Sequence, residues 1–336
     1  LRLTDLRLTD LRLTDLRLIT IFIPKFEKMN KALSVYTLAL GAFFTVAVLG
    51  SYSKLGKKGE AKVFGTDESA YPQFVRPVDL NRDFDFAGEK VPMKNPDARE
   101  RLDRELLVNT YWQSSTLLNM KNAGKFFPVI EPILAKNGIP DDFKYLSVAE
   151  SNLRNETSSA GAKGFWQFMT ETGKYYGLEI NNEVDERYHI EKATEAACKY
   201  ILDYKKRFGS WTMAAAAYNV GGTRLAKEIA AQKAEDYYGL NLNIETSRYV
   251  FRLIAIKEIM QRPRDFGFYL EEDEIYRPQD YNEAVVDGPI DNWGDFAARH
   301  GISYRALKYC NPWLISEKLT NSAGKSYVIK IPKEKF

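Results

Sequence analysis

Apolar residues recur at helical spacing from Asp97 onward. Among Leu102, Leu106, Val108, Trp112 and Leu117, steps of four residues separate Leu102 from Leu106 and Val108 from Trp112, which is typical of an amphipathic helix. Breakers such as Gly209 separate further runs of this kind. These runs are Phe126–Lys136, Asp141–Glu150, Trp166–Tyr176, Ile190–Phe208, Trp211–Tyr218, Thr223–Lys233 and Thr246–Gln261. The pattern predicts a mainly α chain, with one all-helical domain over residues 96–262.

The pattern changes after residue 262. Residues 263–280 are acidic and aromatic without a clear period, and we interpret them as a linker. Residues 281–336 contain two strand-like runs, Tyr281–Val286 and Ser326–Ile331, with two short helical runs around Trp293–His300 and Tyr304–Tyr309 between them. The order of these runs predicts a small βααβ module.

The N-terminal residues differ from the rest. The unit Leu-Arg-Leu-Thr-Asp starts at positions 1, 6 and 11, and a period of five matches neither a helix nor a strand. We expect residues 1–28 to be a mis-assigned upstream repeat, with Met29 as the true start. Residues 29–50 combine a short basic head with the uncharged run Ala32–Gly50. This is typical of a signal peptide or of an uncleaved membrane anchor, and both alternatives stay open.

Composition narrows the location and the class of partner. Of 336 residues 45% are hydrophobic, and the net charge is only +3, which gives no reason to expect a nucleic-acid partner. Residues 51–95 are rich in Gly, Lys, Asp and Pro and predict an extended lead-in. The only cysteines are Cys198 and Cys310, so no cysteine lies directly after the apolar run, where a bacterial lipid anchor would be attached. We expect an exported protein of the bacterial envelope that is not a lipoprotein, with a membrane tether at Ala32–Gly50 as one alternative.

Glu150 is the candidate for chemistry. It ends an apolar helical run, Phe143–Ala149, and precedes a glycine-spaced loop that contains Phe165, Trp166 and Gln167. Apolar surroundings raise the pKa of a carboxyl toward neutrality, where it can donate a proton. Aromatic rings and an amide close by suit a sugar. The alternative is a glutamate that is merely solvated or caps its helix.

Four blocks follow one another in the helical domain. They are Glu150-Ser151, the Gly161-x-x-Gly164-x-Trp166-Gln167 loop, Ala216-Ala217-Tyr218-Asn219-Val220-Gly221 and Glu245-Thr246-Ser247-Arg248-Tyr249-Val250. Together they resemble the signature of the family 23 lytic transglycosylases, which cleave murein and have an SLT domain with a goose-type lysozyme-like fold. The stretches Phe86–Pro92 and Arg99–Trp112 are similar to the membrane-bound D-type branch. The C-terminal unit resembles a LysM module, a binder of N-acetylglucosamine chains.

The resemblance implies the reaction. Glu150 would protonate the oxygen that links N-acetylmuramic acid to N-acetylglucosamine in peptidoglycan. It would then act as base on the C6 hydroxyl of the muramic acid, which attacks its own C1 and leaves a 1,6-anhydro end. We therefore expect peptidoglycan strands as the partner, a monomer and no cofactor. His189 and His300 are isolated, and no metal is expected.

Two alternatives remain from the residues alone. Most glycosidases use two carboxylates, and the nearest second one along the chain is Glu156. A lysozyme-type hydrolase would use Glu156 or another acid to activate water. A non-catalytic adaptor would only bind glycan, although five intact polar and aromatic motif residues count against it.

The resemblance also assigns a set of substrate-binding residues, each with an alternative role. Those near Glu150 are Ser151, Gly164, Trp166, Gln167 and Met169. Ser151 would hold the glutamate or the sugar amide, whereas a polar helix end is the alternative. Trp166 and Met169 are better explained by spacing alone as core residues. Gly164 fits a loop that approaches its ligand closely or needs positive φ.

The later blocks supply Tyr218, Asn219 and Tyr249. Tyr218 and Asn219 suit hydrogen bonds to hydroxyl and N-acetyl groups, and Asn219 could instead cap its helix. Tyr249 lies on an apolar helical face, so packing is the default for it. By resemblance its hydroxyl would point at Glu150 and tune it.

Overall fold

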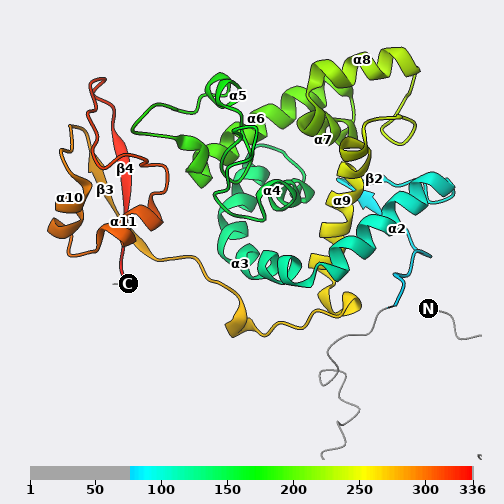
Figure 1. The fold of residues 1–336 in the computed structure, drawn as a ribbon, viewed down its shortest axis with the longest axis horizontal. Coiled ribbons are helices and arrows are strands. Elements are labelled where there is room, and N and C mark those ends of the chain that lie inside the picture. Colours follow the sequence, from blue (N-terminus) through cyan, green and yellow to red (C-terminus); the bar gives the residue numbers. More distant parts are fainter. Residues whose placement is uncertain (1–75, 335–336) are drawn as a thin grey trace, which may run out of the picture. The chain divides into compact units, whose positions relative to one another are not determined.

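The computed structural model describes residues 76–334 (Figure 1). The repeat at 1–28, the apolar segment at 29–50 and the first part of the lead-in lie outside the described residues. Within residues 76–334, no helix is long and apolar enough to cross a membrane. The prediction of a mainly α chain with a small βααβ unit is confirmed.

The helical part consists of eight α-helices and short 3-10 turns. The helices are α2 (Pro96–Tyr111), α3 (Gln113–Lys136), α4 (Lys144–Ser151), α5 (Thr170–Tyr175), α6 (Ile190–Phe208), α7 (Trp211–Val220), α8 (Gly222–Gln232) and α9 (Ile244–Gln261). The turns are η2 (Asp141–Phe143), η3 (Glu186–Tyr188), η4 (Pro263–Phe266) and η5 (Glu272–Glu274). Local chemistry sets several of the ends: the Asn95 side chain accepts from the backbone of Asp97 at the start of α2, and Gly209, at φ 82°, closes α6.

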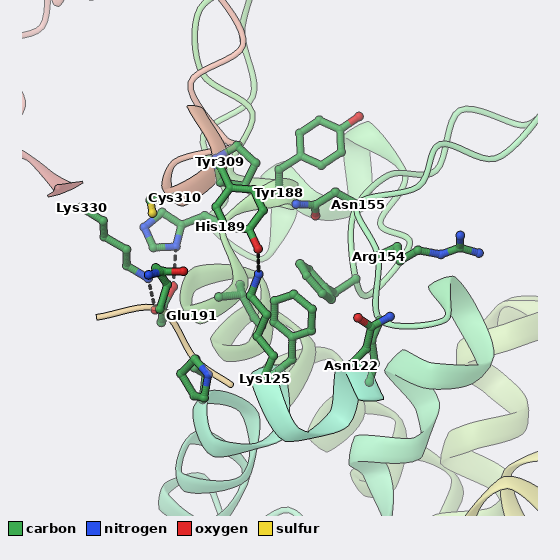
Figure 2. Close-up of a pocket in the computed structure, with 18 of the residues that line it drawn as sticks. Asn122, Lys125, Arg154, Asn155, Tyr188, His189, Glu191, Tyr309, Cys310 and Lys330 are labelled. Carbon is green, nitrogen blue, oxygen red and sulfur yellow. Dashed lines mark hydrogen bonds and ion pairs between the residues drawn. The ribbon is translucent and has the colours of Figure 1, made fainter. Parts of the chain in front are cut away.

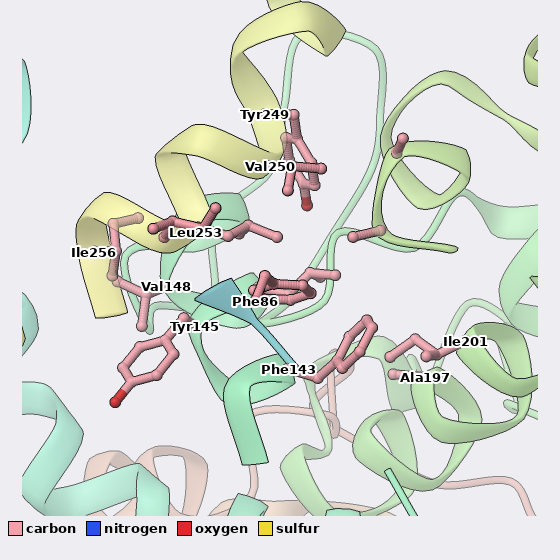
Figure 3. Close-up of a cluster of buried hydrophobic side chains, with 14 of the residues drawn as sticks. Phe86, Phe143, Tyr145, Val148, Ala197, Ile201, Tyr249, Val250, Leu253 and Ile256 are labelled. Carbon is pink, nitrogen blue, oxygen red and sulfur yellow. The ribbon is translucent and has the colours of Figure 1, made fainter. Parts of the chain in front are cut away.

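The core of this part gathers around α4. Its buried Tyr145 and Val148 belong to one cluster with Val250 and Leu253 of α9 and Ile201 of α6 (Figure 3). Helix α7 contributes a run of fully buried alanines, Ala214–Ala217. Small side chains let helices approach closely. The buried apolar side chains of helix α4 belong to the same cluster.

The lead-in is more than an extended approach to the helices. Strands β1 (Asp85–Phe86) and β2 (Glu89–Lys90) form a short antiparallel hairpin. The rings of Phe84 and Phe86 are fully buried in the main core, where Phe86 lies edge-on to Phe143 at 5.1 Å between ring centroids. The last residues of the predicted lead-in are thus part of the helical domain.

The C-terminal unit has the predicted element order. Strand β3 (Tyr281–Val286) pairs antiparallel with β4 (Tyr327–Pro332), with Ala284 opposite Ile329, and helices α10 (Trp293–Arg299) and α11 (Tyr304–Cys310) lie between them in the chain. The core of this unit contains Trp293, Leu307, Trp313 and Ile329, but it also contains Val184, which comes from the loop before α6.

The Val184 loop joins the two parts through backbone bonds. The amide of Asp185 donates to the Trp313 carbonyl at 2.9 Å, and the amide of Ile315 donates to the Glu183 carbonyl at 3.0 Å. The Glu183 carboxylate also accepts from the Thr320 amide at 2.7 Å. Residues 281–334 are therefore fastened to the helical domain by this loop as well as by the connecting segment.

The connecting segment is itself packed. Phe268 is buried against Met120 of α3 and Ile259 of α9. The amide of Tyr276 donates to the Lys121 carbonyl at 3.1 Å, and Gly124 leaves room for Ile275, because a Cβ there would lie 2.1 Å from its side chain. The segment predicted as a linker thus follows the surface of α3.

Shortening Val184 tests this shared core. The side chain is 1% exposed, so Val184→Ala should lower the free energy of unfolding by about 2 kcal/mol. Val108→Ala on α2 is the matched control; Val108 is 39% exposed, and its loss should cost less than about 0.5 kcal/mol. Urea denaturation measures both. Equal effects of the two substitutions, with rapid hydrogen exchange at the amides of Asp185 and Ile315, would contradict the shared core.

Candidate active site

Glu150 is the last residue but one of helix α4. The turn η2 starts the helix after Pro140, and Asn152 ends it in the left-handed conformation at φ 52°. The side-chain oxygen of Asn152 accepts a hydrogen bond from the side-chain Nδ2 of Asn119 at 3.1 Å, and this bond holds the turn against α3. Because the preceding turns of α4 are buried, Glu150 lies where the core meets the surface, and its side chain is only partly exposed.

The carboxyl of Glu150 is held in its neutral form up to an unusually high pH. Burial raises its pKa from 4.5 to about 7. A hydrogen bond from the Tyr249 hydroxyl to Oε1 and the positive charge of Arg252 lower the pKa, while the charge of Glu245 raises it. Loss of water around the carboxyl is the largest of these effects. With a pKa of about 7, the protonated and ionised forms of Glu150 are both populated near neutral pH.

Three of these groups come from one face of α9. Glu245, Tyr249 and Arg252 follow at steps of four and three residues, which places them on one side of the helix. Arg252 lies 3.8 Å from the buried carboxylate of Glu105, which also pairs with Arg248 at 2.6 Å. Part of the Arg252 charge is therefore compensated by Glu105. Glu245 and Arg252 were not among the predicted site residues, although their helical spacing from Tyr249 was a usable signal.

The loop over residues 161–169 has a backbone that only certain residues allow. Gly164 has φ 79°, and a Cβ there would lie 1.9 Å from the Arg187 carbonyl oxygen. The close approach is thus to the protein's own backbone. Arg187 in turn donates to the Phe168 carbonyl at 3.2 Å and forms an ion pair with Asp185 at 2.7 Å.

Hydrogen bonds from Ser151 and Tyr218, and the burial of Trp166, hold this loop in place. The Ser151 hydroxyl lies 3.0 Å from the Phe165 carbonyl, and the Tyr218 hydroxyl donates to the Trp166 carbonyl at 2.7 Å. The Trp166 indole is fully buried and donates to Thr194 at 2.9 Å. Trp166 is therefore a core residue, and the contacts of Ser151 go to backbone rather than to Glu150.

Gln167 and Met169 occupy the outer part of the loop. Gln167 is in the left-handed region at φ 48°, and its side-chain Nε2 donates to the Gly164 carbonyl at 2.8 Å. Met169 is 47% exposed, so the alternative core role for its side chain, which spacing alone favoured, is wrong. The helix predicted from Trp166 begins only at Thr170, because the positive φ angles of Gly164 and Gln167 cannot belong to a helix.

Asn219 lies inside α7 instead of capping it. The cap is Gly221, at φ 86°. The Asn219 side-chain oxygen accepts from the Thr246 hydroxyl at 2.9 Å, which connects the third and fourth motif blocks. The alternative role of Asn219 as a helix cap is therefore wrong.

The structure brings Glu150, Tyr218 and Tyr249 together. Burial and the nearby Glu150 charge raise the pKa of both tyrosines well above the ordinary value of 10.0, so both remain hydroxyl donors. Glu156, the second carboxylate considered above, is exposed and pairs with Arg154 at 3.3 Å. The arrangement is one carboxyl that can give and take a proton, beside tyrosine donors.

The residues of the described range offer no metal site: none of its His, Cys, Asp and Glu side chains form a group of three that could hold an ion. A cavity of about 720 Å³ in this range does not include Glu150 among its lining residues (Figure 2). It is lined instead by residues that follow Glu150 in the chain and by residues of the C-terminal unit.

Replacing Glu150 with its neutral isostere should change stability in a pH-dependent way. The folded chain holds a proton on Glu150 between pH 4.5 and about 7, whereas the unfolded chain releases it, so unfolding becomes easier as pH rises through this window. Glu150→Gln should therefore gain up to about 3 kcal/mol at about pH 8 and little at about pH 5. Denaturation at both pH values measures the gain. The exposed Glu156→Gln is the control, and a gain for Glu150→Gln that is the same at both pH values would contradict the burial effect.

Comparison with known proteins gives two domain families. The family described as "Transglycosylase SLT domain" matches residues 128–241, and "Soluble lytic transglycosylase C-terminal LysM-like domain" matches residues 282–335. The first match includes every predicted site residue except Tyr249.

Individual relatives agree with these families. Membrane-bound lytic murein transglycosylase D of Escherichia coli, from strain K12 and from strain O6:H1, is 29% identical over 258 residues, or 74% of this chain. The chain spans 55% of the length of these relatives. A solved structure of an inactive mutant of lytic transglycosylase Slt from Pseudomonas aeruginosa is 18% identical, with a TM-score of 0.35 over 45% of this chain and 26% of that one.

The described architecture agrees with both family matches, since a helical part that contains Glu150 is followed by a small two-stranded unit. The chain therefore carries a transglycosylase SLT domain followed by a LysM-like domain of the soluble lytic transglycosylase type, and it is homologous to membrane-bound lytic murein transglycosylase D.

Proposed function

We propose that this chain is a peptidoglycan lytic transglycosylase, which cleaves the β-1,4 bond between N-acetylmuramic acid and N-acetylglucosamine. The observation that carries the proposal is the partly buried Glu150, whose pKa is raised to about 7 and whose carboxyl accepts a hydrogen bond from Tyr249. The SLT domain match and the names of the relatives support the same reaction class.

One carboxyl performs both proton transfers in this proposal. Neutral Glu150 donates its proton to the glycosidic oxygen as the bond from C1 of the muramic acid breaks. The resulting carboxylate takes the proton of the C6 hydroxyl, whose oxygen attacks C1 and closes the 1,6-anhydro ring. Glu150 ends protonated, as it began, and no water is consumed. The Tyr249 hydroxyl stabilises the carboxylate between the two steps, because it donates to Oε1.

A single carboxyl argues against the hydrolase alternative. A hydrolase of the two-carboxylate type needs a second acid that faces the first across the sugar. Glu156 is exposed and paired with Arg154. Glu245 is close enough to raise the pKa of Glu150, but it comes from the same helical face as Tyr249. We therefore favour transglycosylation, with muramidase hydrolysis and a non-catalytic adaptor as outcomes of the test below.

Apart from Tyr249, which contacts Glu150, the predicted substrate-binding residues divide into two groups. Gln167, Met169, Tyr218 and Asn219 are partly or largely exposed, and we propose that these contact the sugar rings. Ser151, Gly164 and Trp166 are buried in contacts that shape the 161–169 loop, and we propose that they act by positioning it.

The remaining proposals concern binding and place. We propose that the LysM-like domain binds glycan strands, as its family suggests. We also propose a bacterial envelope location, since the E. coli relatives are named as membrane-bound, with a monomer as the working unit. The apolar run Ala32–Gly50 would provide export or a tether.

Digestion of isolated sacculi tests the reaction. The unmodified chain should release muropeptides with 1,6-anhydro ends, which mass spectrometry recognises because they are lighter by one water than reducing-end products. Glu150→Gln should lower the rate at least about 100-fold, because it removes the general acid and base together. Glu156→Gln is the matched control and should leave both rate and product unchanged.

Two other outcomes would support the alternative functions. Reducing ends from the unmodified chain would support the hydrolase, especially if Glu156→Gln abolished them. No release by any variant, with sacculus binding intact, would support the adaptor.

A further inference from the structure

The cavity of about 720 Å³ lies within the size range of small-molecule sites. Its walls come from α3, from the chain after Glu150, from residues 188–191, from the connecting segment and from the LysM-like domain (Figure 2). Neither domain forms the cavity alone. Because the Val184 loop fastens the two domains together, the walls belong to one packed structure.

Aromatic rings and amides line this cavity. The rings include Phe126, Tyr188, Tyr309 and Trp313, and the His189 imidazole packs on Trp313 at 5.4 Å between ring centroids. Asn122, Asn155 and Gln279 supply side-chain amides. Flat apolar faces beside hydrogen-bonding amides are suited to an N-acetylated sugar.

The charge of the lining is unbalanced. Lys125, Arg154, Arg277 and Lys330 line the cavity, whereas Glu191 is the one carboxylate among the described lining residues. The negative charge of Glu191 is already compensated within the protein. Its carboxylate pairs with Lys330, and His189 Nδ1 lies 3.1 Å from its Oε2. Burial raises its pKa, but these two partners lower it more, to about 2, so Glu191 stays charged.

The cations that remain come from different segments. The Lys125 amine donates to the Tyr309 hydroxyl and lies 4.2 Å from the centre of that ring. Arg154 pairs with the exposed Glu156, whereas Arg277 comes from the connecting segment. An excess of positive charge in an aromatic cavity favours an anionic ligand.

The cavity also adjoins the chain of the active site. Leu153, Arg154 and Asn155 line it and follow Glu150 within five residues. Phe165 lines it too, and the Phe165 carbonyl is the acceptor near the Ser151 hydroxyl. A polymer bound at Glu150 therefore has a neighbouring cavity with a positive lining.

We propose that the cavity between the two domains binds the carboxylate-bearing peptide of an N-acetylmuramoyl unit, next to the bond that Glu150 cleaves. The inference rests on the proposed function, because it takes its ligand from the same polymer. The aromatic walls hold the sugar, and Lys125 and Arg277 attract the peptide carboxylates. A neutral chitin-type glycan has no group that would use these cations.

Calorimetric titration of the full chain with an N-acetylmuramoyl peptide tests the inference. The probe has no glycosidic bond to cleave, so binding is measured without turnover. Its matched partner is the same compound with the peptide carboxyls amidated. The free acid should bind about tenfold more tightly than the amide, and Arg277→Gln should remove most of this difference. Arg224→Gln, an exposed cation on α8, is the control and should leave the difference intact.

Three results would overturn the inference. The unmodified chain could bind neither compound, it could bind acid and amide equally, or Arg224→Gln could weaken the acid as much as Arg277→Gln does. The failure of the proposed function is distinct, since it would show as missing anhydro products from sacculi while the acid is still preferred over the amide.

Discussion

The packing of the helical domain around α4 keeps water from one carboxyl, that of Glu150, and the proposed chemistry depends on this burial. A glutamate at the end of an exposed helix would ionise near pH 4.5 and could not protonate a sugar oxygen at neutral pH. Helix α4 is enclosed by α3, α6 and α9, and this enclosure raises the pKa to about 7. The hydrogen bond from Tyr249 limits the shift, so the carboxylate remains accessible during a reaction that needs both forms.

The loop beside Glu150 is connected to the C-terminal domain through a short series of contacts. Val184 is buried in the core of the LysM-like domain, and Asp185 next to it pairs with Arg187. Arg187 reaches the carbonyl of Phe168, and its own carbonyl lies where only Gly164 leaves room. A continuous series of contacts thus runs from the core of the LysM-like domain to the loop beside Glu150. The two domains form a single packed structure, and the cavity between them is a product of that packing.

Regular spacing predicted the elements well, and it failed where structure depends on contacts distant in the sequence. The βααβ order and most helix positions followed from periodicity. The turn before α5 did not, because its positive φ at Gln167 and the close approach at Gly164 depend on Arg187. The hairpin that buries Phe86 has strands of only two residues, too short to show a period. Val184 is one apolar residue in a polar loop, and nothing local indicates that it belongs to another core.

The candidate site shows the same division. Glu150 could be chosen from its apolar helix, but the bond from Tyr249 joins residues 99 positions apart, and periodicity alone favoured packing for that ring. The resemblance to a known family suggested the contact that spacing could not. Glu245 and Arg252 were within reach of helical spacing on α9 once Tyr249 was selected. Spacing alone favoured the core role of Trp166, which is fully buried. The role of Ser151 could not be assigned, because its hydroxyl contacts a backbone carbonyl of a loop whose path was unknown.

The central claim is that enclosure makes Glu150 a proton donor near neutral pH. The most direct measurement is an NMR titration of the Glu150 side-chain carboxyl in the folded chain, assigned by comparison with Glu150→Gln. The account predicts a midpoint at about pH 7, well above the 4.5 of a solvated glutamate. A midpoint near 4.5 would contradict it, because Glu150 would then be ionised at neutral pH and could not serve as the acid.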